Sequence, residues 1–231
     1  MMLKRYLIVN LTVFFLLIVY GFTPVNSYLT STAVVVKVIQ DVKHKKPNTD
    51  WTQTKPATPL QTRDELKTGE KSVAVLRFLD GSTIRVRENT SIKVYADKVG
   101  KGLKKNTAID VGKVRFEVEK QEEEDEFIII TPTAVATIRG TTGLVSVLED
   151  GTTLLSVEEG IVEVKAIVGA GESGTVEAGK TSFISQEGKV NIENTSTELL
   201  NELKNSIRTN ERFIRLQTSG GTFRVYYLDV E

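Results

Sequence analysis

Apolar and polar residues alternate with a period of two along most of the chain beyond Tyr28. This alternation is typical of β-strands that bury one face. The alternating segments are also rich in β-branched residues, which favour strands. The pattern predicts strands at Thr32–Asp41, Ile92–Tyr95, Ile109–Val118, Phe127–Thr131, Val135–Ile138, Ile161–Val168 and Lys180–Ser185.

Two Asp-Gly turns predict two β-hairpins of the same design. In residues 73–86 a three-residue loop with a left-handed glycine places Leu76 opposite Ile84. Residues 145–157 repeat this arrangement. The turn residues are Asp80 and Gly81 in the first hairpin and Asp150 and Gly151 in the second. The predicted buried faces consist of Ala74, Leu76, Phe78, Ile84 and Val86, and of Val145, Val147, Leu155 and Val157.

Many short strands at close spacing indicate an all-β fold, an antiparallel roll or sandwich over residues 28–190. Residues 43–70 interrupt the pattern with three of the five prolines, and we expect a long loop with one short strand there. The charged runs 98–105 (basic) and 121–126 (acidic) are interpreted as solvated loops.

Residues 191–231 have a different pattern and form a C-terminal extension. Thr195 and Glu198 have the spacing of a capping box, and Leu199, Leu203 and Ile207 follow on one helical stripe. Residues 212–228 then predict a second kind of hairpin, with a two-residue turn at Gly220-Gly221 that pairs Leu216 with Val225. Its apolar face must be covered, either by the rest of the chain or by a second copy in a homo-oligomer.

Residues 1–27 predict a signal peptide or an N-terminal membrane anchor. Lys4 and Arg5 precede an apolar run, Tyr6–Phe22, and Val25 and Ser27 fit a cleavage site. An uncleaved anchor is the alternative, because about 17 apolar residues are the lower limit for spanning a bilayer. In both cases the bulk of the chain is expected outside the cytoplasm, periplasmic or secreted, and membrane contact is limited to residues 3–22.

Composition excludes several functional classes. Thirty basic and thirty acidic residues give no net charge, so no nucleic-acid partner is expected. The chain has no cysteine, and its single histidine, His44, lies in a lysine-rich segment where a solvated side chain is expected. These residues offer no thiol nucleophile, no metal site and no histidine triad, and we expect no catalytic residues and no cofactor.

The stretch Thr131–Gly143 contains a glycine-rich segment that resembles a phosphate loop at first sight. It lacks a following Gly-Lys-Ser/Thr, and strand residues rather than a helix come after it. We therefore interpret it as a corner between strands. Pro132 ends strand pairing, Gly140 permits a bend, and Arg139 is expected to bond turn carbonyls or a carboxylate, with a ligand-binding role as the alternative.

The order of these segments resembles the FecR domain of bacterial envelope proteins. The most distinctive block is residues 127–164, and residues 66–86, 111–118 and 174–185 resemble the flanking strands. The residues that carry this resemblance, with an expected structural role, are Asp80, Gly81, Thr131, Pro132, Arg139, Gly140, Thr141, Asp150, Gly151 and Gly160.

The resemblance implies a non-catalytic binding module in the cell envelope, with an envelope protein as its partner. A polysaccharide or peptidoglycan binder is the alternative, and it would need Trp51, Tyr95, Tyr226 or Tyr227 exposed and grouped. FecR regulators also carry a cytoplasmic segment that controls a sigma factor. Only about five residues precede the apolar run here, so transmembrane signalling is the less favoured interpretation.

Overall fold

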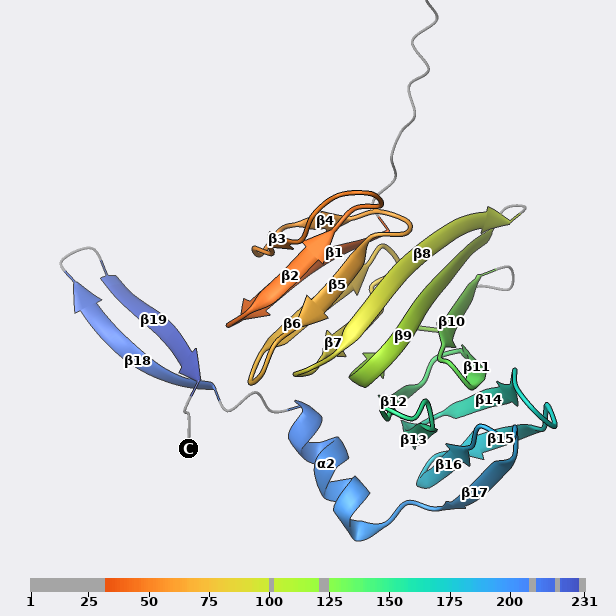
Figure 1. Cartoon of the computed structure of the whole chain (residues 1–231). Helices are drawn as coiled ribbons and strands as arrows, with labels where there is room; N and C mark the ends of the chain where they lie inside the picture. Colours follow the sequence, from red (N-terminus) through yellow and green to blue (C-terminus); the bar gives the residue numbers. More distant parts are fainter. Residues whose placement is uncertain (1–31, 100–101, 121–124, 208–210, 219–220, 229–231) are drawn as a thin grey trace, which may run out of the picture. The chain divides into compact units, whose positions relative to one another are not determined.

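The computed structural model describes residues 32–99, 102–120, 125–207, 211–218 and 221–228. Figure 1 shows these residues as ribbons. The expected signal or anchor, residues 1–27, and most of the acidic run lie outside the described residues. None of the described helices is long and apolar enough to cross a membrane.

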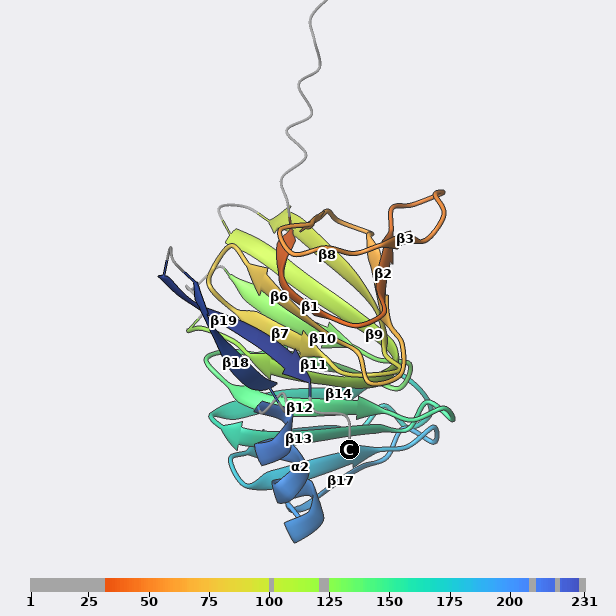
Figure 2. The same ribbon diagram turned by 90° about the vertical axis from the view of Figure 1, so that its left-hand side faces the viewer.

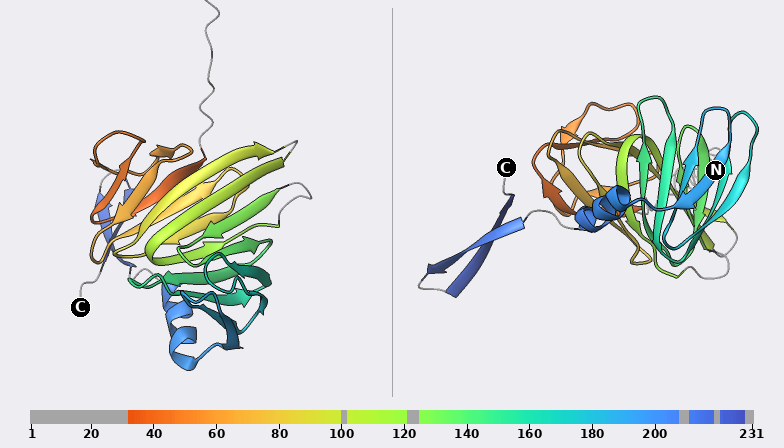
Figure 3. Two further views of the ribbon diagram at one scale, coloured as in Figure 1. Left: turned by 45° about the vertical axis from the view of Figure 1, so that its right-hand side comes forward. Right: turned by 90° about the horizontal axis from the view of Figure 1, so that it is seen from below.

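Residues 32–194 form two layers of mostly antiparallel strands (Figures 1 and 3). In order of pairing, layer 1 contains β4 (Pro59–Leu60), β1 (Ala33–Ile39), β6 (Val73–Phe78), β7 (Thr83–Val86), β9 (Gly102–Glu117), β12 (Thr142–Val147), β13 (Thr153–Glu159), β16 (Lys180–Ile184) and β17 (Val190–Asn194). Layer 2 contains β3 (Thr52–Gln53), β2 (Val42–Lys45), β5 (Glu65–Thr68), β8 (Ser91–Val99), the first part of β9, β10 (Glu126–Ile130), β11 (Ala134–Ile138), β14 (Ile161–Ala166) and β15 (Ser173–Glu177).

Strand β9 belongs to both layers. Its first part pairs with β8 and, in parallel, with β10, whereas its last six residues pair with β12 and partly with β7. The change occurs at Gly112, whose φ is +104°. A Cβ at this position would collide with Thr90, so only glycine fits this bend.

The hydrophobic core lies between the layers. Both Asp-Gly hairpins have the expected register, with Leu76 opposite Ile84 and Val145 opposite Leu155. The side chains predicted to form their inner faces are all buried. Phe78 of layer 1 meets Phe127 of layer 2 edge to face, with ring centroids 5.0 Å apart. The all-β fold class is confirmed.

Two of the expected loops are strands. Residues 43–70 include β3, β4 and β5 and most of β2, because these short strands satisfy their backbone groups against β1 and β8 despite the prolines. The basic run 98–105 is also not a solvated loop: β8 extends to Val99 and β9 starts at Gly102. Strand β17 has no counterpart among the expected strands.

Helix α2 (Thr197–Ile207) is the one helix among the described residues. It is capped by Ser196, whose Oγ accepts the backbone N–H of Leu199 at 3.3 Å, and not by Thr195 as expected. The Thr195 side chain is buried and hydrogen-bonded to Thr181 instead. Tertiary contacts therefore remove the expected capping residue from the helix.

The C-terminal hairpin consists of β18 (Glu211–Thr218) and β19 (Gly221–Leu228). Its turn lies one residue earlier than expected, so Leu216 pairs with Phe223 and not with Val225. The side chains of this hairpin lie outside the described residues. What covers its apolar positions stays a prediction.

Candidate functional site

Arg139, Gly140 and Thr141, which are among the residues that carry the FecR resemblance, form a corner that joins the two layers. Gly140 has a φ of +61°, and Arg139–Thr141 leads the chain from β11 in layer 2 to β12 in layer 1. The Thr141 hydroxyl donates to the Ile161 carbonyl at 2.9 Å, and its backbone exchanges hydrogen bonds with Val118. A Cβ on Gly160, whose φ is +86°, would lie 2.8 Å from the Gly140 carbonyl oxygen. Gly160 therefore stands where the backbone has no room for a side chain, and Gly140 stands where a left-handed backbone favours glycine.

The turn between β10 and β11 contains the buried hydroxyls of Thr131 and Thr133. The Thr153 hydroxyl donates to Thr131 Oγ1 at 2.8 Å, and Thr133 Oγ1 lies 2.8 Å from Thr153 Oγ1. Thr133 also donates to the Gly151 carbonyl at 3.0 Å, next to the exposed ring of Pro132. This network connects the β10–β11 turn to the second Asp-Gly turn.

Arg139 is exposed, and its guanidinium makes no hydrogen bond or ion pair with a residue that the structure describes. Only its backbone carbonyl takes part in the corner, accepting from Thr141 at 3.2 Å. The expected bonds from Arg139 to turn carbonyls are therefore not found in the described part of the chain. The side chain is accessible to a ligand.

The two Asp-Gly turns differ in their surroundings. Asp80 and Asp150 each accept a backbone N–H two residues later, at 3.1 and 2.8 Å. Asp80 additionally binds the ammonium of Lys105, 2.7 Å away, whose side chain is only 1% exposed. Asp150 is exposed at the surface.

Of the four aromatic residues expected for a sugar site, the structure describes the side chains of Trp51 and Tyr95, and these two make no ring contact with each other. Trp51 is half-buried, and the ammonium groups of Lys45 and Lys67 lie 4.9 and 4.3 Å from its ring centroid. Tyr95 lies on β8, and the side chains of Tyr226 and Tyr227 are outside the described residues. His44 is half-buried rather than solvated and bonds Thr54 Oγ1 through Nδ1 at 3.0 Å.

A cationic surface that the sequence patterns did not single out lies on the outer side of layer 1. Cross-strand pairing aligns Lys37 with Val75, Val75 with Arg85, and Arg85 with Arg115. Arg77 and Arg87 flank this row on the same strands or directly after them. We call Lys37, Val75, Arg77, Arg85 and Arg87 the basic face.

The positive charges of the basic face are only partly compensated. Arg85 lies directly opposite Arg115, and its Nη1 is buried without a hydrogen bond to any described residue. Burial lowers the pKa of Arg85, Glu117 opposes this shift, and Arg87 and Arg115 lower the pKa further. The pKa of Lys37 is lowered by burial and then by repulsion from Arg85. An incoming negative charge would be stabilised here.

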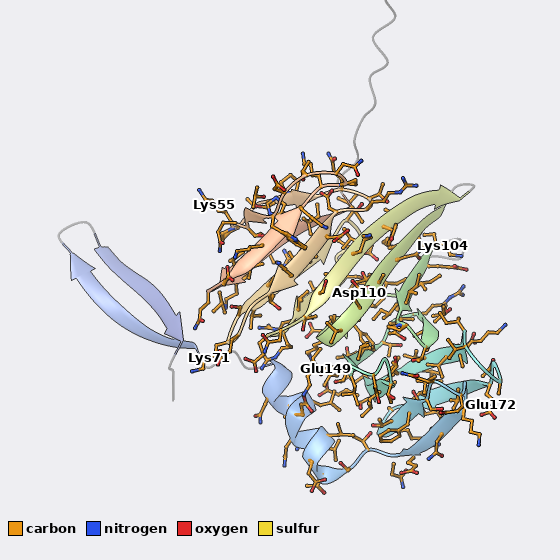
Figure 4. All side chains as sticks on the ribbon, viewed as in Figure 1. Lys55, Lys71, Lys104, Asp110, Glu149 and Glu172 are labelled. Atoms are coloured by element: carbon orange, nitrogen blue, oxygen red, sulfur yellow. The ribbon has the colours of Figure 1, made fainter. Side chains whose placement is uncertain are left out.

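Arg115, in contrast, is fully paired. Its Nε lies 3.1 Å from Glu117 Oε1, its Nη2 lies 2.7 Å from Glu158 Oε2, and its Nη1 donates to the Leu203 carbonyl of α2 at 3.4 Å. Helix α2 thus covers one part of the outer side of layer 1 and ends beside the basic face (Figure 2). Many other charges, such as Lys55, Lys71 and Glu172, point into solvent at the periphery (Figure 4).

The basic face could have been found in the sequence from the hairpin register. Positions 75, 77, 83 and 85 alternate with the predicted core positions, so Arg77 and Arg85 had to lie on the outer side. Their approach to Lys37 and Arg115 depends on strand order, which the pattern does not give.

The model of the family described as FecR protein matches residues 64–163, which confirms the resemblance stated from the sequence. Two crystal structures, at 1.65 and 2.50 Å resolution, of a protein from Parabacteroides distasonis described as a candidate anti-sigma factor are similar in fold. Each has a TM-score of 0.52 and 16% identity, and the match covers 64% of this chain and 66% of that one. The chain thus spans slightly less than two thirds of that protein. No curated protein matches.

Proposed function

We propose, from the premise that residues 64–163 form a FecR domain, that the protein is a non-catalytic module outside the cytoplasm that binds a protein partner in the cell envelope. The family match and the fold shared with a candidate anti-sigma factor support a signalling or regulatory type of module. The basic face is the proposed binding surface.

The observation that carries this proposal is the half-buried Arg85, whose Nη1 has no hydrogen bond to a described residue and whose charge Glu117 compensates only in part. A half-buried guanidinium opposite a second arginine costs stability, and a protein that needed only its own fold would gain from an apolar residue there. Arginine is also enriched in protein interfaces, and Val36 of β1, next to Lys37, adds an apolar side chain that is 40% exposed.

The proposal is tested by affinity capture of the tagged full-length chain from its native envelope. The double variant Arg85→Glu/Arg87→Glu is compared with Lys165→Glu/Lys189→Glu, which makes the same change in charge at exposed positions away from the basic face. We expect specific protein partners with the wild type and the control variant, and their loss with the double variant. Equal capture by all three proteins would remove the basic face from the proposal, and capture of polysaccharide alone would replace the protein partner by a glycan.

A further inference from the structure

Helix α2 lies beside layer 1 (Figures 2 and 3). It lies on the same side as the basic face, because its Leu203 carbonyl binds Arg115, which is the cross-strand partner of Arg85. Just before the helix, Thr195 bonds Thr181 of β16 at 3.0 Å. Further along, the Leu203 carbonyl accepts from Arg115 of β9. Asn205, near the end of α2, lines a groove of about 300 Å³ together with Arg87. The helix therefore runs from β16 towards β7, where the basic face begins.

The contacts of α2 show which chemical groups the outer side of layer 1 binds. Leu203 is 2% exposed and is the apolar anchor of the helix. Glu202 forms an ion pair with Lys113 of β9. The Leu203 carbonyl, in the last turns where the helix dipole is negative, accepts from Arg115. Helix α2 thus places a carboxylate on Lys113 and a backbone carbonyl on Arg115, whose carboxylate partners, Glu117 and Glu158, come from the sheet itself.

The basic face repeats the composition of the surface under α2. Arg85 and Arg87 correspond to Arg115 and Lys113, and Val75 provides the apolar position between Lys37 and Arg85. The two surfaces are continuous, because Arg87 and Lys113 line the same groove. What differs is that the Nη1 of Arg85 is buried without a partner among the described residues, whereas Arg115 is paired.

The C-terminal hairpin does not match this surface in charge. Residues 211–228 carry Arg212, Arg215 and Arg224 and one acidic residue, Glu211. An extended strand added to the part of β1 beyond its short pairing with β4 does not match it either. Such a strand would lie about three strand spacings, roughly 14 Å, from β7 and its arginine side chains. An element that lies over the layer reaches them directly.

We infer that the basic face binds an acidic amphipathic helix of the partner protein, lying over β6 and β7 next to the end of α2. This inference rests on the proposed function and names the class of partner. Leucine-type side chains of the helix pack on Val75, and its carboxylates pair with Arg85 and Arg87 in the way that Glu202 pairs with Lys113.

Fluorescence anisotropy with labelled peptides tests the inference on the full-length protein. The helical probe joins two copies of residues 195–207, the α2 sequence. A scrambled probe has the same composition without an apolar stripe, and polyglutamate and hyaluronate represent charge alone and an anionic glycan. We expect the helical probe to bind about tenfold more tightly than the scrambled one, to gain helicity in circular dichroism, and to lose about tenfold in affinity with Arg85→Glu/Arg87→Glu. Lys165→Glu/Lys189→Glu should leave its affinity unchanged.

Equal binding of the helical and scrambled probes, binding of hyaluronate alone, or no binding of any probe would each overturn the helix inference. The capture experiment separates this failure from a failure of the proposed function. If partner capture depends on Arg85 and Arg87 while the helical probe does not bind, the proposed function stands and the helix inference is wrong. If capture does not depend on these residues, the basic face is not the binding surface, and the helix inference is wrong with it.

Discussion

The ammonium of Lys105 lies 2.7 Å from the Asp80 carboxylate and joins layer 2 to the first Asp-Gly turn of layer 1. Lys105 is opposite the core residue Phe127 in the strand register, and its side chain is 1% exposed. Asp125 lies 3.6 Å from the same ammonium. A buried lysine requires such carboxylates, because an unpaired charge in the interior is strongly destabilising.

We predict that Asp80→Asn lowers the free energy of unfolding by about 3 kcal/mol, since it leaves Lys105 with only the more distant Asp125. The asparagine oxygen keeps the backbone hydrogen bond of the turn, while its amide nitrogen replaces the oxygen that binds Lys105 and accepts from the Ser82 hydroxyl. Asp150→Asn in the matching turn is the control, with an expected change within about 0.5 kcal/mol. Urea denaturation measures both. Similar losses at the two positions would mean that the turn, and not the ion pair, determines the cost.

Arg139→Ala should change the free energy of unfolding by less than about 0.5 kcal/mol, because the exposed guanidinium makes no bond with a described residue. Thr131→Val should lower it by about 1–2 kcal/mol, because Thr153 and the Ala134 N–H lose their buried acceptor. Thermal unfolding of both variants checks this order. A larger loss for Arg139→Ala would restore the structural role that the sequence alone suggested.

Gly112→Ala should be among the most destabilising single changes, at roughly 3 kcal/mol or more. A left-handed backbone costs an alanine about 1–2 kcal/mol, and the Cβ would also collide with Thr90. Gly179→Ala is the matched control, because Gly179 has a φ of +80° and nothing lies within 4 Å of an added Cβ. In chemical denaturation, Gly179→Ala should lose only the free energy of unfolding that the left-handed backbone costs an alanine. Equal losses for the two variants would contradict the steric collision with Thr90 at the Gly112 bend.

His44 should titrate below its ordinary pKa of 6.5, because burial disfavours the imidazolium and Lys46 adds to this shift, while Asp64 opposes it. A lowered pKa in the folded state means that the unfolded chain binds more protons near pH 6. The contribution of His44 to stability is therefore present above pH 6.5 and is lost as the pH falls through the folded pKa. NMR follows the ring of this single histidine directly. A measured pKa at or above 6.5 would contradict the assignment.

Arg85→Met should raise the free energy of unfolding, by up to about 1 kcal/mol, since it removes a half-buried cation opposite Arg115 and an unsatisfied N–H donor. Arg77→Met at an exposed position should have no measurable effect. Thermal unfolding of both variants measures these two changes in stability. A destabilised Arg85→Met would show that the arginine supports the fold and would weaken its assignment to binding.

Local signals are enough to predict most strands and both Asp-Gly hairpins, because alternation and turn residues act between neighbours in the chain. The register around Asp80 and Asp150 follows from turn geometry within about fourteen residues. Local signals misplaced the C-terminal turn by one residue, because Ser219-Gly220 and Gly220-Gly221 are both acceptable turn sequences.

Which charges are buried and which surfaces face one another follows from contacts between residues far apart in the chain. Lys105 appeared in the sequence as part of a solvated run, and it is buried because Asp80, 25 residues away, supplies its counter-charge. Lys37, Arg85 and Arg115 come from three separate strands, and strand order brings them into one row. Charge compensation and surface composition depend on long-range pairing, whereas alternation depends on neighbours in the chain. This is why the strands and the outward position of Arg77 and Arg85 follow from the sequence, and the row that Arg85 forms with Lys37 and Arg115 does not.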